Sequence, residues 1–314
     1  MSKIAFLFPG QASQYVGMAK DLHEIFPEVR ELYEKAADIL EYDLAKVSFE
    51  GPEELLTQTK YTQPAVFVHS MALLSVLKKE GIRPDFVAGH SLGEYSAAVC
   101  AGFFKTFQQG LWAVQDRSLL MQRACEKNPG TMAIIIGLSW DKVLEICQQA
   151  SSEGVVQPAN FNSADQIVIS GSLAGVKKAM ELAEAAGALI VKELKVEGAF
   201  HTPLMVLAGN GMAETLDLIN MRKPKVPLVS NVTGRPVTDP REFKELLVEQ
   251  ITSPVLWHQS MEYLYGEEGI RDFVEIGPGK VLQGLLRRSF NDVNVYGIDK
   301  LPDLEKFIKT KTPY

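Results

Sequence analysis

The sequence predicts an α/β fold, in which a large body of strands and helices carries a smaller inserted subdomain of ferredoxin-like topology. Short apolar segments such as residues 4–8 and 86–89 alternate with longer helical patterns, which is typical of a sheet covered by helices. Residues 127–196 instead have the order β-α-β-β-α-β, which is the ferredoxin-like arrangement. A chain of 314 residues is long enough for one large domain with such an insertion.

In the body, capping and turn residues mark the ends of the expected elements. Thr62 and Pro64 are expected at the start of one helix, and Gly81 ends it. The chain from Lys306 onwards is expected to be frayed and solvated. Strands are expected at residues 4–8, 86–89, 226–230 and 272–276, and helices at 26–40, 62–80, 92–101, 107–125, 240–252 and 280–290.

The inserted subdomain is expected to span residues 127–196, so that residues 1–126 plus 197–314 form the body. Its second helix ends at Gly187, a residue type common just after a helix. Its strands are expected at 131–136, 155–160, 166–170 and 189–194, and its helices at 140–150 and 173–186.

Composition narrows the class of protein. The chain is 46% hydrophobic with a net charge of −7, so we expect neither nucleic-acid nor membrane binding driven by overall charge. Cys100, Cys125 and Cys147 are too far apart for a zinc motif and too few for a disulfide framework. The apolar run at residues 4–8 stops at Pro9, too short for a signal peptide. A cytoplasmic protein without metal or other cofactor is therefore expected, with a monomer as the default.

Ser91 lies in the most informative motif, Gly-His-Ser-Leu-Gly at residues 89–93. An expected strand precedes the motif and an expected helix follows it, which is the context of a nucleophile elbow. The glycines permit a tight turn, and the amino end of the helix favours negative charge beside the hydroxyl. The pattern predicts that Ser91 is a nucleophile, whereas an ordinary turn that contains a serine is the alternative.

A serine nucleophile needs a base within hydrogen-bond reach. His201 lies where the inserted subdomain ends and the chain returns to the body, and clefts form at such junctions. His258 is the competitor. The other histidines are expected to have packing or surface roles, or to point away from Ser91: His23, His69 and His90.

The third member of a serine–histidine–acid triad is missing from the sequence pattern. Asp141 and Asp165 both fall within the inserted subdomain, and neither has the expected position. A backbone or side-chain carbonyl can hold the imidazole instead, so we expect a Ser–His dyad.

Arg117 stands in the middle of an expected helix, among residues that should face the core. It either extends to the surface and forms an ion pair there, or binds a substrate carboxylate through its guanidinium group.

Six motifs follow one another along the chain: Phe-Pro-Gly-Gln-Ala-Ser-Gln at 8–14, Gly-His-Ser-Leu-Gly-Glu-Tyr at 89–95, Arg117 with Met121-Gln122, Asn-Phe-Asn-Ser at 160–163, Ala-Phe-His at 199–201 and Glu-Ile-Gly-Pro-Gly at 275–279. In this order they resemble those of the malonyl-CoA:acyl carrier protein transacylase family and of the related acyltransferase domains of polyketide synthases. The resemblance covers about residues 4–300 and implies an α/β-hydrolase-like body, with malonyl-CoA and a phosphopantetheinyl carrier protein as substrates.

The resemblance also implies individual roles. Ser91 attacks the malonyl thioester, and His201 is the general base and later the acid. Gln250 supplies the backbone carbonyl that orients the histidine. Backbone N–H groups of Gln11 and Leu92 form the oxyanion hole. Three further residues complete the implied set: Arg117, which pairs with the malonyl carboxylate, and Gln63 and Asn160, which lie near the pocket.

Two positions bear on details of the resemblance. Phe200, directly before the histidine, resembles malonyl-selective members, and its ring should leave little room for an α-methyl group. One methyl group contributes only about 1–3 kcal/mol to discrimination in a pocket, so partial selectivity is expected. Ala12 stands where many relatives have glycine, and we expect the chain to tolerate it.

Malonyl transfer to a carrier protein is thus the leading hypothesis. A serine thioesterase or esterase is the alternative within enzymes, disfavoured by Arg117 and by the missing acid. An inactive carrier-protein docking module is the alternative from another class. Carrier proteins are usually acidic, so a local basic patch is expected to bind one, with Lys280, Arg287 and Arg288 as candidates and a solvated helix face as the alternative.

Overall fold

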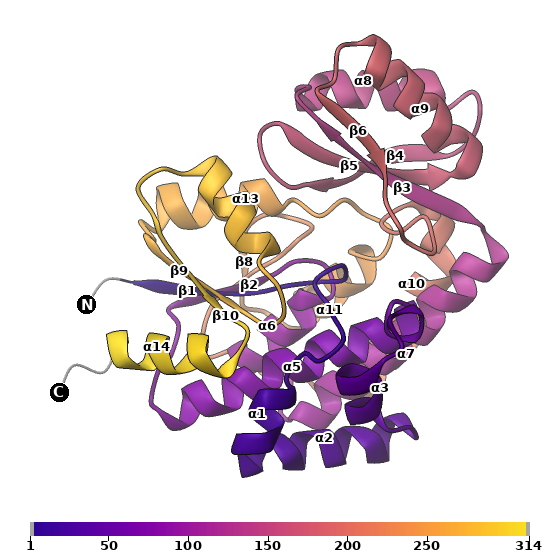
Figure 1. Cartoon of the computed structure of the whole chain (residues 1–314). Helices are drawn as coiled ribbons and strands as arrows, with labels where there is room; N and C mark the ends of the chain where they lie inside the picture. Colours follow the sequence, from indigo (N-terminus) through magenta and orange to yellow (C-terminus); the bar gives the residue numbers. More distant parts are fainter. Residues whose placement is uncertain (1–2, 312–314) are drawn as a thin grey trace.

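The computed structural model describes residues 3–311, which form a large α/β body and a smaller unit with a sheet of its own (Figure 1). The large sheet has the strand order β10-β9-β1-β2-β7-β8, parallel throughout except for β8, which runs antiparallel to β7. Its strands are β1 (Ile4–Phe8), β2 (Phe86–Gly89), β7 (Leu228–Val229), β8 (Pro236–Val237), β9 (Asp272–Ile276) and β10 (Asn294–Ile298).

Helices cover both faces of this sheet, because its central strands are apolar on both sides. Phe6 and Phe8 of β1 pack into one core with most of the helices, whereas Ala5 and Leu7 face a second core with α12 and α13. The helices of the body are α1 (Lys20–Ile25), α2 (Pro27–Leu40), α3 (Leu44–Glu50), α4 (Glu53–Leu56), α5 (Thr59–Lys79), α6 (Gly93–Ala101), α7 (Phe107–Lys127), α10 (Val206–Leu218), α11 (Pro240–Glu249), α12 (Trp257–Glu262), α13 (Val281–Ser289) and α14 (Leu301–Lys311).

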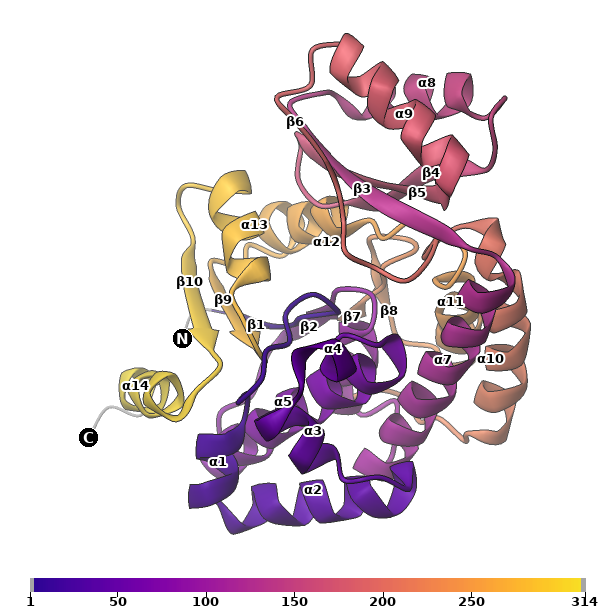
Figure 2. The ribbon, with the colours of Figure 1, turned by 45° about the vertical axis from the view of Figure 1, so that its right-hand side comes forward.

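The smaller unit is a four-stranded antiparallel sheet with the order β4-β5-β3-β6. Its helices pack on one face, where Ala133 and Ile135 of β3 point, and the opposite face turns toward α13 and the large sheet (Figure 2). Its elements are β3 (Gly130–Ile136), α8 (Trp140–Ala150), β4 (Val156–Phe161), β5 (Gln166–Ser172), α9 (Leu173–Ala185) and β6 (Ile190–Glu193).

The sequence prediction was wrong about the C-terminal tail. Residues 306–311 belong to α14, where Phe307 is buried in the main core and Lys311 pairs with Asp272 at 2.8 Å. The lysines made the segment look solvated, but they lie on the outer side of an amphipathic helix. Residues 312–314, the rest of the predicted tail, lie outside the described residues.

The start of α5 also differs from the prediction. The helix begins at Thr59 after the N-cap Gln58, so that Thr62 and Pro64 lie inside it. A proline within a helix leaves the carbonyl four residues earlier without its usual donor. The Tyr42 hydroxyl lies 3.5 Å from that carbonyl, on Lys60. The periodic pattern gave no signal for several whole elements, among them helix α10 and strand β10.

Candidate active site

Ser91 occupies the sharp turn between β2 and α6. Its backbone has φ 52°, a left-handed conformation that L residues adopt at a cost of about 1–3 kcal/mol. The flanking glycines are required because the turn packs so closely. A Cβ on Gly89 would lie 2.0 Å from the Gly93 carbonyl group, and a Cβ on Gly93 would lie 2.0 Å from the Phe8 oxygen. Strain of this kind persists only where the surrounding structure fixes the residue, so the neighbours of Ser91 must stabilise this conformation.

His201 is the base that faces the serine. Its Nε2 lies 2.9 Å from the Ser91 Oγ, and its Nδ1 lies 2.7 Å from the backbone oxygen of Gln250. Since a carbonyl only accepts, Nδ1 carries the proton, and Nε2 is free to accept from the serine hydroxyl. Burial first, and then the charge of Arg117, lower the pKa of His201 to about 3. The imidazole is therefore neutral at physiological pH, as a base must be before the reaction.

Arg117 of α7 lies in the same cluster, fully buried rather than at the surface. Its Nη1 donates to the Gln63 Oε1 at 2.7 Å, and its Nη2 donates to the Gln250 Oε1 at 3.0 Å. Nη2 also lies 3.2 Å from the Ser91 Oγ. The two glutamine oxygens that accept from Arg117 belong to neutral amides. A guanidinium in this position can pair with an anionic group on a molecule attached to Ser91.

A cavity of about 220 Å³ lies beside Ser91 and His201, between the smaller sheet and the body. Ser91 and His201 line it, together with Gln11, Asn160 and Phe200. Apolar side chains form much of the rest of its wall, among them Met132 and Ile134 of β3 and Leu285 of α13. Gln63 and Arg117 lie behind this lining and reach it through their hydrogen bonds.

Backbone donors also face this region. Gln11 lines the cavity in the loop after β1, and Leu92 directly follows Ser91. Within residues 3–311, neither backbone N–H of these two residues donates to an acceptor of the chain. Backbone N–H groups without internal acceptors at the edge of a cavity are suited to binding an oxyanion.

Sequence reasoning missed two residues that support the cluster. The Asn231 Oδ1 accepts from the Ser91 N–H at 2.7 Å, and the buried Glu94 accepts from the Asn231 N–H at 3.0 Å. Burial raises the pKa of Glu94 to about 7, although hydrogen bonds from Asn231 and Gln250 and the charge of Arg117 act in the opposite direction. Glu94 stands beside the serine motif, so its position was a usable signal. Nothing in the local sequence distinguishes Asn231.

The remaining histidines do not contact Ser91. The His258 Nε2 lies 3.3 Å from Glu262, and its ring packs on Trp140, so the competitor for the base is far less suitably placed than His201. The other three have different partners: His23 packs on Tyr33 and Phe49, His90 bonds Asn162, and His69 bonds Asp299.

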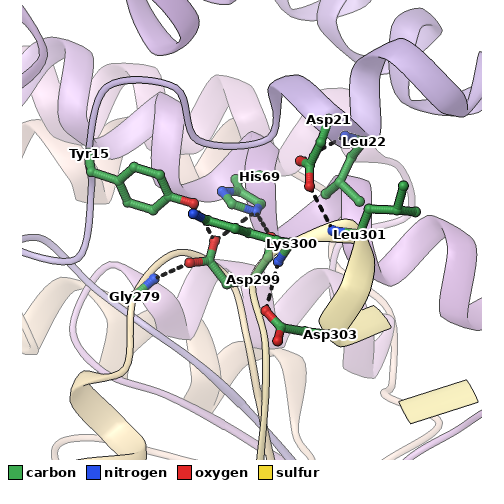
Figure 3. Close-up of polar contacts among 9 residues, drawn as sticks. All are labelled: Tyr15, Asp21, Leu22, His69, Gly279, Asp299, Lys300, Leu301 and Asp303. Carbon is green, nitrogen blue, oxygen red and sulfur yellow. Dashed lines mark hydrogen bonds and ion pairs between the residues drawn. The ribbon is translucent and has the colours of Figure 1, made fainter. Parts of the chain in front are cut away.

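His69 belongs to a second buried polar group, the Asp299 cluster, formed by Asp299, His69 and Tyr15 (Figure 3). The Asp299 backbone oxygen lies 2.8 Å from the His69 Nε2, and its carboxylate accepts from the Tyr15 hydroxyl at 2.9 Å. Gly279 donates its N–H to the same carboxylate. This cluster joins α5, the loop after β1 and the end of β10. We call the group around the nucleophile the Ser91 cluster; its members are Ser91, His201, Arg117 and Gln250.

No helix in residues 3–311 is long and apolar enough to cross a membrane. Within the same range, no three His, Cys, Asp or Glu side chains are grouped as ligands for a metal ion.

Comparison with known proteins identifies the family. The model of the acyl transferase domain matches residues 5–307, nearly the whole chain. The chain belongs to the acyl transferase family. Ser91, His201 and Arg117 all fall within the matched region, so the cluster built from the geometry lies inside the family's domain.

Relatives within this family share one name. The malonyl CoA-acyl carrier protein transacylase of Bacillus subtilis (strain 168) is 42% identical over 99% of this chain and 98% of its own length. The protein of that name from Staphylococcus aureus (strain MRSA252) is 40% identical, over 97% and 98%.

Solved structures agree with this family assignment. The Streptococcus pneumoniae structure named MCAT has a TM-score of 0.93 and 37% identity, and the match covers 98% of this chain and 100% of that one. A malonyl-transacylase solved in complex with a type II PKS acyl-carrier protein has a TM-score of 0.95 at 37% identity, with the same coverage. The mixed α/β architecture is therefore shared over almost the whole chain.

Proposed function

We propose that this chain transfers a malonyl group from malonyl-CoA to the phosphopantetheine thiol of an acyl carrier protein, through a malonyl ester on Ser91. The observation that carries the proposal is the buried guanidinium of Arg117, 3.2 Å from the nucleophile. A serine hydrolase needs no buried cation there, whereas an acyl group that ends in a carboxylate does. The names of the relatives and the solved carrier-protein complex support the same reaction.

In the first half-reaction the Ser91 Oγ attacks the thioester carbonyl, and the His201 Nε2 takes the hydroxyl proton. The backbone N–H groups of Gln11 and Leu92 stabilise the oxyanion, a role in which one donor contributes about 3–4 kcal/mol. The tetrahedral intermediate collapses, the C–S bond breaks, and His201 returns the proton to the sulfur of CoA. The Gln250 carbonyl keeps the imidazole in the required tautomer throughout, 2.7 Å from Nδ1.

In the second half-reaction the thiol of the carrier protein gives its proton to His201 and attacks the malonyl ester. The C–O bond to Ser91 breaks, and the serine oxygen recovers the proton. Each half-reaction thus leaves the enzyme unchanged, and no cofactor takes part besides the two substrates.

Arg117 selects the acyl group. When the malonyl carboxylate pairs with the guanidinium, the buried charge gains an anionic partner that acetyl cannot supply. Gln63 holds Arg117 in position through the bond of 2.7 Å to Nη1. Asn160 and Phe200 border the acyl group from the cavity wall. The ring of Phe200 disfavours an α-methyl substituent, so Phe200→Ser should raise the rate ratio of methylmalonyl to malonyl loading.

We also propose a division of the fold into two subdomains. Residues 127–196 are a ferredoxin-like subdomain, supported by the β-α-β-β-α-β order and the strand order β4-β5-β3-β6. Residues 1–126 plus 197–314 are an α/β-hydrolase-like catalytic body, supported by the parallel sheet and the Ser91 turn at the end of β2. A cytoplasmic location, consistent with three free cysteines, belongs to the same proposal.

The carrier protein docks on α13 in this proposal. Leu282 and Leu285 of that helix line the cavity, and three basic side chains project from its exposed side: Lys280, Arg287 and Arg288. Acidic carrier proteins are attracted to such a patch. Reversing the charge of Arg287 and Arg288 should raise KM for the carrier protein and leave malonyl loading unchanged. An unaltered KM would remove both residues from the docking surface.

The test of the function is intact-protein mass after brief mixing with malonyl-CoA or acetyl-CoA. The wild-type protein should gain one malonyl group, and Ser91→Ala should gain none. Arg117→Ala should lose the preference for malonyl and accept acetyl. Release of free acid from both donors without a persistent adduct would instead identify a hydrolase and refute the role given to Arg117.

A further inference from the structure

Glu94 is a buried carboxylate next to the nucleophile that the proposed reaction leaves without a role. It lies in the first turn of α6 and is 1% exposed. Its Oε1 accepts from the Asn231 N–H at 3.0 Å, its Oε2 accepts from the Gln250 Nε2, and the Ser230 side chain is a further hydrogen-bond partner. A carboxylate this deep in a protein is costly unless it is hydrogen-bonded, so its burial depends on the donors of Asn231 and Gln250.

Gln250 connects Glu94 to both the base and the cation. Its Nε2 donates to Glu94 and to the Ser91 backbone oxygen, at 3.0 Å for the latter. The Gln250 Oε1 accepts from the Arg117 Nη2 at 3.0 Å, and the Gln250 backbone oxygen accepts from the His201 Nδ1. The side-chain amide has only one orientation that satisfies Glu94, the Ser91 oxygen and Arg117, because an ionised Glu94 can only accept and Arg117 can only donate.

Asn231 connects Glu94 to the strained turn. Its Oδ1 accepts from the Ser91 N–H at 2.7 Å, and its Nδ2 donates to the Gly89 oxygen at 2.7 Å. The two bonds clamp the turn on both sides of the serine, which needs such support to remain at φ 52°. Glu94 in turn fixes the backbone of Asn231.

We propose that Glu94 is a positioning residue that holds Gln250 and Asn231, and through them Arg117, His201 and Ser91, in the geometry for malonyl transfer. This inference rests on the proposed function. Glu94 need not contact the substrate, because it acts by supplying two acceptors where the neighbours present two donors.

Replacement by glutamine makes the role testable. Glu94→Gln keeps the shape, but its side chain offers one acceptor and one donor group, so it cannot satisfy both donors. If the amide of residue 94 opposes the Gln250 Nε2, the Gln250 amide turns over and presents its NH2 group to Arg117. Malonyl loading depends on Arg117 and acetyl loading does not, so the two rates should respond differently.

The experiment measures Ser91 loading from malonyl-CoA and from acetyl-CoA in the wild type, Glu94→Gln and Glu275→Gln. Glu275 is a matched control, because it is 1% exposed and accepts from the N–H groups of Leu282 and Gln283. In Glu94→Gln the malonyl-to-acetyl rate ratio should fall about tenfold to 100-fold, the loss typical of a hydrogen bond to a charged group. Glu275→Gln should lower the thermal midpoint of unfolding about as much as Glu94→Gln does, and it should keep the wild-type ratio of malonyl to acetyl loading.

The outcomes separate the two proposals. A wild type that does not load malonyl refutes the proposed function itself. A wild type that prefers malonyl, together with an unchanged ratio in Glu94→Gln, refutes only the role of Glu94. If Glu94→Gln does not fold, Glu94→Asp takes its place in the experiment. Aspartate keeps the charge, but its side chain is one methylene shorter. A wild-type ratio of malonyl to acetyl loading in Glu94→Asp overturns the inference.

Discussion

The Ser91 cluster and the Asp299 cluster each contain a buried histidine that is hydrogen-bonded to a backbone carbonyl, yet only one is suited to catalysis. His201 bonds the Gln250 oxygen through Nδ1, and His69 bonds the Asp299 oxygen through Nε2. Burial lowers the pKa of both rings. The two histidines therefore share burial, tautomer control and neutrality at physiological pH.

They differ in what the second nitrogen faces. The His201 Nε2 faces the Ser91 hydroxyl beside a cavity, whereas the His69 Nδ1 is enclosed and has no hydrogen-bond partner among residues 3–311. None of the three members of the Asp299 cluster lines that cavity. A buried, oriented histidine is thus a base only when a reactive group and space for a substrate adjoin its free nitrogen. The Asp299 cluster instead ties three segments of the body together (Figure 3).

The largest expected effect contrasts the two histidines directly. His201→Ala should slow malonyl loading of Ser91 by about 10²-fold to 10⁴-fold, the range for loss of a positioned base. His69→Ala should change the rate less than about threefold while lowering stability by about 1–3 kcal/mol. Stopped-flow release of CoA measures the rates. Equal losses of rate in the two variants would contradict the difference between His201 and His69 in the loading of Ser91.

The buried carboxylate of the Ser91 region should make stability depend on pH. The pKa of Glu94 is raised to about 7, from an ordinary value near 4.5. The contribution of Glu94 to the unfolding free energy is complete below about pH 4.5. It is lost as pH rises through about 7, because the folded state then holds a buried charge. Between pH 5 and 8 the wild type should lose about 2–3 kcal/mol more unfolding free energy than Glu94→Gln, measured by urea denaturation. Parallel pH curves for the two proteins would contradict the raised pKa.

A smaller effect is expected at the Asp299 cluster. Asp299 accepts from the Tyr15 hydroxyl with one carboxylate oxygen and from the Gly279 N–H with the other. Asp299→Asn leaves only one acceptor, so unfolding free energy should fall by about 1–2 kcal/mol. Malonyl loading should remain within about twofold of the wild type, and a loss as large as that of His201→Ala would assign this cluster a part in the reaction.

The smallest effect concerns Ala12, in the loop that presents Gln11. Its φ of 74° is left-handed, a conformation that costs alanine about 1–2 kcal/mol and that glycine adopts without this cost. Ala12→Gly should raise unfolding free energy by about 1 kcal/mol or less, since relief of strain exceeds the greater entropy of unfolded glycine. Ala19→Gly, at φ 61° beside α1, is the matched control. Both should stabilise the protein, but only Ala12→Gly should alter loading.

Local patterns predicted much of the fold and part of the site. Ser91 was recognisable because a nucleophile elbow has a fixed sequence spacing, and the strands of the smaller sheet followed from alternation and turn residues. Arg117 stood out because a cation among apolar helix positions is rare. Helix α10 escaped prediction because its sequence is apolar around most of its circumference and has few polar positions to mark a face.

The sequence by itself determined the alternation of strands and helices, the turn that presents Ser91 and the position of Arg117 within a helix. These depend on spacing within a few residues. Only the tertiary structure decided between His201 and His258, brought the Gln250 carbonyl to within 2.7 Å of His201, and placed Glu94 and Asn231 around the turn. These contacts join residues up to 142 positions apart, and hydrogen bonds over such separations leave no periodic trace in the chain.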